Sequence, residues 1–166
     1  AYCEGYNATD DVCTVFGDST SCVSMEWMVM DYQEGFDGTS GIAGLSTGLG
    51  NWETGPLVIQ ELYAASKITD DVFAFWLGGE DENSYLDIGT ILDDGMRDPD
   101  ELVWLDVVED DFWWTNYITG LRTTSVDGDV LEYAIDTSYG MTDTGTSCIY
   151  VPTDFYNSFM NMVFDG

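Results

Sequence analysis

Histidine is absent from this chain of 166 residues. Without an imidazole group, the chain can hold neither a Ser-His-Asp or Cys-His catalytic centre nor a zinc ion with histidine ligands. Any chemistry that occurs on this protein must therefore use carboxylates, hydroxyls, backbone groups or a bound ion.

Basic residues are also scarce: Lys and Arg number 3 against 32 Asp and Glu, for a formal net charge of −29 at pH 7. Lys67, Arg97 and Arg122 cannot form a basic patch, so nucleic-acid binding through phosphate neutralisation is excluded. Docking to an anionic membrane surface is disfavoured for the same reason. No apolar run is long enough to span a bilayer, and we expect no membrane insertion.

The acidic residues gather in short clusters, such as 80–82 and 109–111, that lack the alternating spacing of a calcium loop. We therefore predict no metal site and interpret the clusters as solvated loops. Adaptation to acid or to high salt is a second interpretation, compatible with the first. Crowded carboxylates repel one another at neutral pH, and this repulsion fades when they are protonated or screened.

Hydrophobic residues make up 45% of the chain and aromatic residues 14%, which argues for a packed core and against disorder. Short apolar runs separated by turn residues predict a mainly β structure. The continuous apolar run 72–77 is typical of a strand buried on both faces, so we expect sheets stacked in layers. Further strands are expected at 12–16, 25–30, 85–88, 102–108, 117–121, 130–135 and 148–151, and short helices at 56–67 and after Pro152-Thr153.

Four cysteines and one glycosylation sequence favour an oxidising compartment. Asn7 begins the sequence Asn-Ala-Thr, a short acceptor for N-linked glycans. The disulfide candidates allow three pairings, among which the sequence does not choose. We predict at least one disulfide within residues 3–22, and Cys148 can pair with a cysteine outside this chain. The candidates are Cys3, Cys13, Cys22 and Cys148.

The segment that carries chemistry lies between two apolar stretches near the carboxyl end. Asp143 stands at its tip, followed by Thr144, Gly145, Thr146 and Ser147. Gly145 permits a close backbone approach, and the hydroxyls can hydrogen-bond the carboxylate. A carboxylate held in this way is oriented as a general acid or base requires. The sequence Asp-Thr-Ser at 136–138 is a weaker version without the glycine, and we interpret it as a loop.

The sequence Asp-Thr-Gly-Thr-Ser at 143–147, followed by an apolar strand, Pro152 and a short helix, resembles the second active-site loop of pepsin-like aspartic proteases. Other pieces resemble that family in the same order along the chain. The strand leaving the flap is similar to 5–12, and the N-lobe segment that ends in two apolar residues and glycine is similar to 15–17, 36–38 and 41–45. The helix that follows is similar to 56–67, and the end of the N-lobe is similar to 72–77 and 85–89. The first C-lobe strands are similar to 104–107 and 112–114.

The resemblance implies an all-β, pepsin-like bilobal fold, of which this chain is a central portion with two short helices. Residues 1–92 would belong to the late N-lobe and 93–166 to the early C-lobe. Asp143 would be the second catalytic aspartate, with Thr144 bonding between the lobes and Thr146 bonding the outer carboxylate oxygen. The other implied roles are Ile42, Ala43 and Gly44 bracing the first aspartate loop, and Phe36 and Ile42 lining the substrate cleft.

The implied function is peptide-bond hydrolysis by a water activated between two aspartates, with no cofactor. A single Asp-Thr-Gly is present, so the other aspartate would lie outside this chain, and the chain alone should be inactive. Partners would be a peptide or protein substrate and the remaining parts of the same protein or neighbouring copies. Secretion or an acidic vacuole-like or lysosome-like compartment is expected.

Two alternatives remain. The first is a catalytically inactive pepsin-like homologue that acts as a secreted structural or binding protein; the residue aligned with the first aspartate would decide. The second is a salt-adapted acidic β-protein in which Asp-Thr-Gly occurs by chance, which the ordered matches along the chain disfavour.

Overall fold

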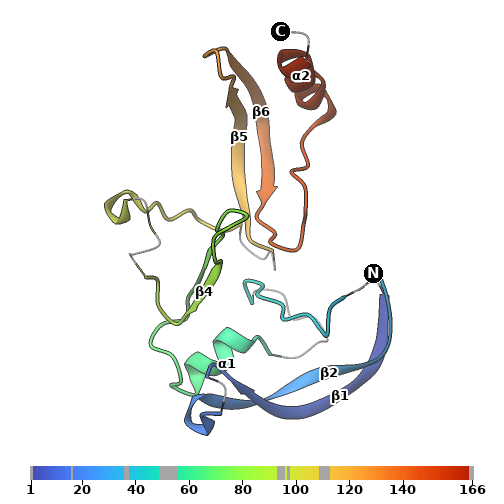
Figure 1. The fold of residues 1–166 in the computed structure, drawn as a ribbon, viewed down its shortest axis with the longest axis vertical. Coiled ribbons are helices and arrows are strands. Elements are labelled where there is room, and N and C mark those ends of the chain that lie inside the picture. Colours follow the sequence, from blue (N-terminus) through green and yellow to red (C-terminus); the bar gives the residue numbers. More distant parts are fainter. Residues whose placement is uncertain are drawn as a thin grey trace. The chain divides into compact units, whose positions relative to one another are not determined.

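A computed structural model describes residues 2–15, 17–35, 38–48, 56–92, 96, 98–108 and 113–164. The chain divides into two compact units, residues 1–103 and 104–166, each of which is considered by itself. Both units are built mainly from β-hairpins, and each contains one α-helix (Figure 1). The sequence prediction of a mainly β chain with two short helices is therefore confirmed. The lobe boundary expected between residues 92 and 93 stays a prediction.

The first unit opens with a long antiparallel hairpin of β1 (Tyr2–Cys13) and β2 (Cys22–Glu34). The register shifts between Glu4 and Gly5, where β2 contains one extra residue. Gly5 is required there, because a Cβ at this position would collide with the carbonyl oxygen of Val29. The expected strand at 12–16 is wrong in its bounds: β1 begins ten residues earlier and ends at Cys13, and Phe16 lies outside the described residues.

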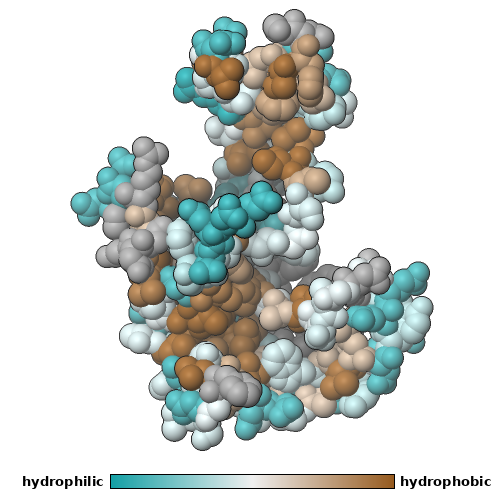
Figure 2. Space-filling view, in the orientation of Figure 1, coloured by the Kyte–Doolittle hydropathy of each residue, from teal (hydrophilic) through white to brown (hydrophobic). Residues whose placement is uncertain are grey.

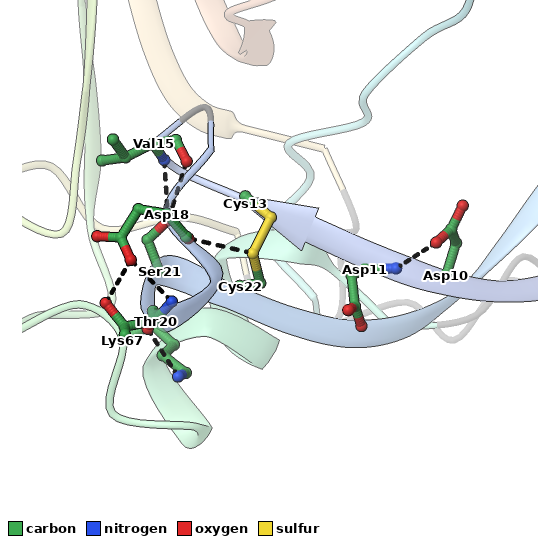
Figure 3. Close-up of a disulfide and its surroundings, with 9 residues drawn as sticks. All are labelled: Asp10, Asp11, Cys13, Val15, Asp18, Thr20, Ser21, Cys22 and Lys67. Carbon is green, nitrogen blue, oxygen red and sulfur yellow. Dashed lines mark hydrogen bonds between the residues drawn. A yellow bond between two sulfur atoms is a disulfide. The ribbon is translucent and has the colours of Figure 1, made fainter.

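A disulfide closes the end of this hairpin, since Cys13 and Cys22 are directly opposite in the register and are bonded (Figure 3). The connecting turn contains the 3₁₀ helix η1 (Ser19–Ser21). Asp18 caps it, accepting from the Thr20 amide at 2.8 Å and the Thr20 hydroxyl at 2.6 Å. These bonds, hydroxyl first, lower the pKa of Asp18, and the charge of Lys67 adds to the effect.

Helix α1 (Val58–Ala64) packs against β2. Ile59 and Leu62 are buried on the inner face of the helix, and Met25 is buried on β2. The helix begins two residues later than the expected 56, and it ends before 67 because Ser66 adopts a positive φ of 56°. The amide of Lys67 then donates to the carbonyl of Leu62 at 2.8 Å, a hydrogen-bond pattern that ends helices.

A second hairpin pairs β3 (Phe73–Trp76) with β4 (Tyr85–Ile88). The rings of Trp76 and Tyr85 stack across it at 5.1 Å. The prediction that the run 72–77 is buried on both faces is wrong, because Phe75 is 40% exposed and Leu77 70%. Among the described residues, this sheet has only these two strands. A 3₁₀ helix, η3 (Pro99–Glu101), follows.

The second unit consists of the hairpin β5 (Thr115–Thr124) and β6 (Val130–Met141) with helix α2 (Thr153–Phe164). The buried ring of Phe155 meets the ring of Tyr133 on β6 at 5.9 Å. The register jumps from Ile118–Ser138 to Gly120–Ala134, so three residues of β6 face one of β5. The interpretation of 136–138 as a loop is therefore wrong: the extra residues form a bulge within β6.

Two further expected strands, 102–108 and 148–151, are also wrong, because neither segment forms a strand in the structure. Both have apolar sequences, but a strand requires a partner to complete its backbone hydrogen bonds. The side chains of 102–105 and of Ile149 and Tyr150 are exposed instead. No helix within the described ranges is long and apolar enough to cross a membrane.

The apolar surface is largely uncovered. Buried apolar side chains among the described residues are Met25, Ile59, Leu62 and Phe155. The chain exposes 13021 Å² of surface, whereas two separate globular units of these sizes would expose about 9,800 Å² together. Hydrophobic residues lie at the surface of each unit (Figure 2). Both units therefore carry apolar faces of the kind that usually pack against further chain.

The Cys13–Cys22 bond should be found intact in native protein. Its sequence separation is 9 residues. Closing such a short loop in the unfolded chain makes the cross-link worth roughly 2–3 kcal/mol. Replacing both Cys13 and Cys22 by serine should lower the denaturant midpoint accordingly, whereas Cys148→Ser, at an exposed free thiol, should change it little. Non-reducing peptide mapping that recovers Cys13 and Cys22 as alkylated thiols would contradict the assignment.

Candidate active site

The Asp143 loop joins the end of β6 to the start of α2. The amide of Thr142 donates to the carbonyl of Trp114 at 3.0 Å, which extends the hairpin pairing by one residue. After the loop, the amide of Tyr156 donates to the carbonyl of Pro152 at 3.0 Å and begins α2, as the Pro152-Thr153 pair predicted. Asp143 is thus tied to the hairpin by the residue before it, while α2 begins ten residues further along the chain.

Both oxygens of the Asp143 carboxylate accept a hydrogen bond from within the loop. Oδ1 accepts from the amide of Gly145 at 2.9 Å, and Oδ2 accepts from the hydroxyl of Thr146. The amide of Thr146 also donates to the carbonyl of Asp143 at 3.2 Å, which closes a turn through Thr144 and Gly145. Asp143 and Thr146 are half-buried. The carboxylate is therefore held in one orientation by the next three residues.

These hydrogen bonds lower the pKa of Asp143 below its ordinary value, with the Thr146 hydroxyl as the larger cause and the Gly145 amide second. Partial burial opposes the effect. Donors that point at a carboxylate stabilise its charged form. In both Asp143 and Asp18, therefore, hydrogen-bond donors within the next three residues set the direction of the pKa shift.

Gly145 stands close to the carboxylate. A Cβ at this position would lie 3.2 Å from Oδ1 of Asp143, closer than side-chain carbons ordinarily approach a neighbouring atom. A side chain here would therefore push the carboxylate away from the Gly145 amide. Thr144 is exposed at the outer corner of the same turn.

The remaining candidate residues lie in the first unit. Ile42, Ala43 and Gly44 follow β2 in an exposed segment, with Ile42 63% exposed. Together with β2 and residues 56–58 they line a groove of that unit. Phe36 lies outside the described residues. The roles of these residues, like those of Thr144 and Thr146 in catalysis, stay predictions.

The structure also places the cysteines and the glycosylation candidate. Cys13 and Cys22 form the disulfide, while Cys3 on β1 is a half-buried thiol and Cys148 an exposed one. Asn7 is exposed on β1. Within the part of the chain that the structure describes, no three His, Cys, Asp or Glu side chains are grouped so that they could hold a metal ion.

One contributor to the site has no signal in the sequence. The carbonyl of Trp114, on the residue before β5, fixes the amide next to Asp143. Because this contact uses a backbone oxygen, no residue type at position 114 predicts it. This contact could have been inferred only from the register in which β5 pairs with β6.

Comparison with known proteins gives one family match. A family model described as eukaryotic aspartyl protease matches residues 4–164, which includes the Asp143 loop. No curated protein and no solved structure matches the chain.

The role of the Thr146 hydroxyl in lowering the pKa of Asp143 can be tested by titrating Asp143. In the complete protein, Thr146→Val removes the donor without changing the size of the side chain, so the pKa of Asp143 should rise toward its ordinary value. Thr146→Ser keeps the hydroxyl and should leave the pKa low. Carbon-detected NMR titration of the Asp143 carboxyl measures both.

The lowered pKa of Asp143 determines how the stability of the folded protein changes with pH. Wild-type Asp143 contributes stability above its unfolded pKa and loses it as the pH falls through its folded pKa. Thr146→Val should therefore be less stable than Thr146→Ser at neutral pH, with the difference shrinking at strongly acid pH. Equal pKa values for Asp143 in the two variants would contradict the role given to the hydroxyl.

Proposed function

The chain belongs to the eukaryotic aspartyl protease family, and we propose that it is the central part of an aspartic endopeptidase in which Asp143 is one of two aspartates that activate water. The mostly β structure with two helices is consistent with a portion of the pepsin-like fold. The observation that carries the proposal is the Asp143 loop, whose carboxylate is oriented by Gly145 and Thr146.

The lowered pKa of Asp143 suits the role of a base. Two carboxylates placed close together cannot both ionise readily, so they share one proton. We assign the charge to Asp143, because the Gly145 amide and the Thr146 hydroxyl stabilise its carboxylate, and the proton to its partner. In this arrangement Asp143 accepts a proton from water, whose oxygen attacks the peptide carbonyl carbon. The protonated partner donates its proton to the carbonyl oxygen, which gives a neutral gem-diol. As the C–N bond breaks, the proton held by Asp143 passes to the leaving amine, and a hydroxyl proton of the diol returns to the partner.

The second carboxyl group is proposed to come from another Asp-Thr-Gly or Asp-Ser-Gly loop of the same protein, outside this chain. Ile42, Ala43 and Gly44 would brace that loop, and Thr144 would bond across to it. Phe36 and Ile42 would line the substrate cleft, which suits peptides with apolar side chains. The exposed apolar faces of both units support the packing of further chain against them.

A location in the secretory pathway, in a secreted form or in an acidic vacuole-like or lysosome-like compartment, is part of the proposal. The Cys13–Cys22 disulfide supports it, since such bonds persist in oxidising compartments. The substrate class that follows from the family is a peptide or protein.

Asparagine substitutions at two aspartates test the assignment. In the complete protein, Asp143→Asn should lower proteolysis at acid pH by at least about a hundredfold, because the amide cannot accept the proton of water. The variant should remain folded at the assay pH, because the amide oxygen can still accept from Gly145 or Thr146, although it loses the stability that the charged carboxylate adds above its unfolded pKa. The matched control is Asp136→Asn, at an exposed residue on β6 with a similar Asp-Thr sequence, which should retain full activity.

Two further outcomes decide between the proposal and its alternatives. A complete protein that is folded but inactive before any substitution would favour the non-catalytic homologue. Peptide cleavage by the 166-residue chain alone would show that a second Asp-Thr-Gly loop is not needed, and would overturn the two-aspartate assignment.

A further inference from the structure

The two faces of the β1–β2 hairpin differ in character. Ala8, Val12 and Trp27 are half-buried and Met25 is buried on one face, the face that packs near α1. Residues on the opposite face alternate with these along each strand. This opposite face, called here the polar face, is exposed at the six positions from the Asn7–Met28 pair to the Asp11–Ser24 pair; its members are Asn7, Thr9, Asp11, Ser24, Glu26 and Met28.

Both functional residues of the sequence Asn7-Ala8-Thr9 lie on the polar face. Side chains two positions apart in a strand point the same way, and both are exposed. Asn7 is also the one asparagine of the chain followed two positions later by Ser or Thr. Across the hairpin, Asn7 is opposite Met28 and Thr9 is opposite Glu26. A bulky group on Asn7 would therefore project away from the packed face.

The hydrogen bonding of Asn7 leaves room for a modification. Nδ2 donates to Oε1 of Glu26 at 3.0 Å. An asparagine amide nitrogen carries two hydrogens. Replacing one of them by a sugar leaves the other available to Glu26, so the modified side chain can keep its contact with β2.

We propose that Asn7 carries an N-linked glycan that projects from the polar face of the hairpin. The donor would be an oligosaccharide joined through pyrophosphate to a polyisoprenol lipid. Nδ2 of Asn7 forms a bond to the anomeric carbon of the first sugar, and the bond from that carbon to the pyrophosphate oxygen breaks. The lipid pyrophosphate leaves, and one amide proton passes to a base of the transferase.

The glycan also fixes which side of the hairpin is outside. A glycan must extend into solvent, so further chain cannot cover the polar face. Additional strands or lobes must then pack against the opposite face or the edges of the hairpin. This consequence rests on the proposed function, in which the chain is part of a larger protein; the glycan itself does not depend on catalysis.

The test expresses the complete protein in a eukaryotic secretory host. Treatment of the secreted wild type with a glycan-releasing amidase should increase gel mobility and convert Asn7 to Asp in peptide mass mapping. Asn7→Gln and Thr9→Ala should lose the shift, while Thr9→Ser, which keeps the acceptor sequence, should retain it. Secreted wild type with Asn7 unmodified, or a shift retained by Thr9→Ala, would overturn the proposal.

A second set of variants tests the choice of face. Asn7→Gln combined with Ala8→Asn and Asp10→Thr moves the acceptor to the packed face. Asn7→Gln with Ala8→Asn and Asp10→Ala has the same asparagine without an acceptor sequence. Glycosylated molecules of the first variant should lose the Cys13–Cys22 cross-link or fail to be secreted. The second variant should give a higher yield of secreted, disulfide-linked protein than the first. Equal yields of disulfide-linked product from wild type and the moved acceptor would overturn the assignment of the face.

The two proposals fail separately. A glycosylated, secreted protein without proteolytic activity would leave the glycan standing and remove the catalytic role. An active protease with unmodified Asn7 would support the catalytic role and overturn the glycan.

Discussion

A two-stranded hairpin has two unpaired edges and two faces, and one short helix can cover only part of one face. This constraint governs both units of the chain. Helix α1 packs on the β1–β2 hairpin and α2 on β6, and the buried apolar side chains of the described residues lie in these two contacts or next to them. In the hairpin β3–β4, the aromatic side chains of Phe75, Trp76 and Tyr85 are exposed. Isolated two-stranded sheets are marginally stable in water, so the hairpins require further strands for a stable core. That requirement explains why so apolar a sequence buries so little, and it agrees with a portion of a larger fold.

The Asp143 loop does not need further strands, because its hydrogen bonds are made with residues close to it in the sequence or in the same hairpin. Its carboxylate is held by donors two and three residues further along the chain, and its start is tied to the hairpin through Thr142 and Trp114. Neither arrangement needs a second lobe. Pairing of two carboxylates, by contrast, is a long-range property that no local sequence can provide. The chain therefore forms the local geometry of the Asp143 loop by itself, whereas the pairing of carboxylates proposed above would depend on other chain.

Prediction from the sequence succeeded where local chemistry decides and failed where pairing decides. Pro152 and Thr153 marked the start of α2, the run 85–88 coincided with β4, and the hydroxyl of Thr146 bonds the carboxylate as the loop sequence suggested. The apolar runs 102–108 and 148–151 form no strand: the first makes isolated hydrogen bonds through Asp106 and Val108, and these do not continue into a ladder in the described part of the chain. The bulge of β6 is likewise a property of two strands in register, since three residues face one. The residue types at 135–137 do not predict this bulge.

The contrast between Asp136 and Asp143 shows what the glycine adds. Both aspartates are followed by threonine, yet only Asp143 has its carboxylate enclosed by the hydrogen bonds recorded for the described residues. Asp136 lies within β6, where extended backbone carries the residue three positions onward by about 10 Å, out of hydrogen-bond reach. After Asp143 the chain turns through Thr144 and Gly145, which returns Thr146 to the carboxylate. A larger residue at 145 would crowd Oδ1 and weaken the bond from its amide. The glycine therefore keeps the backbone close enough to hold the acid, and this closeness makes the second sequence a candidate site while the first remains part of a strand.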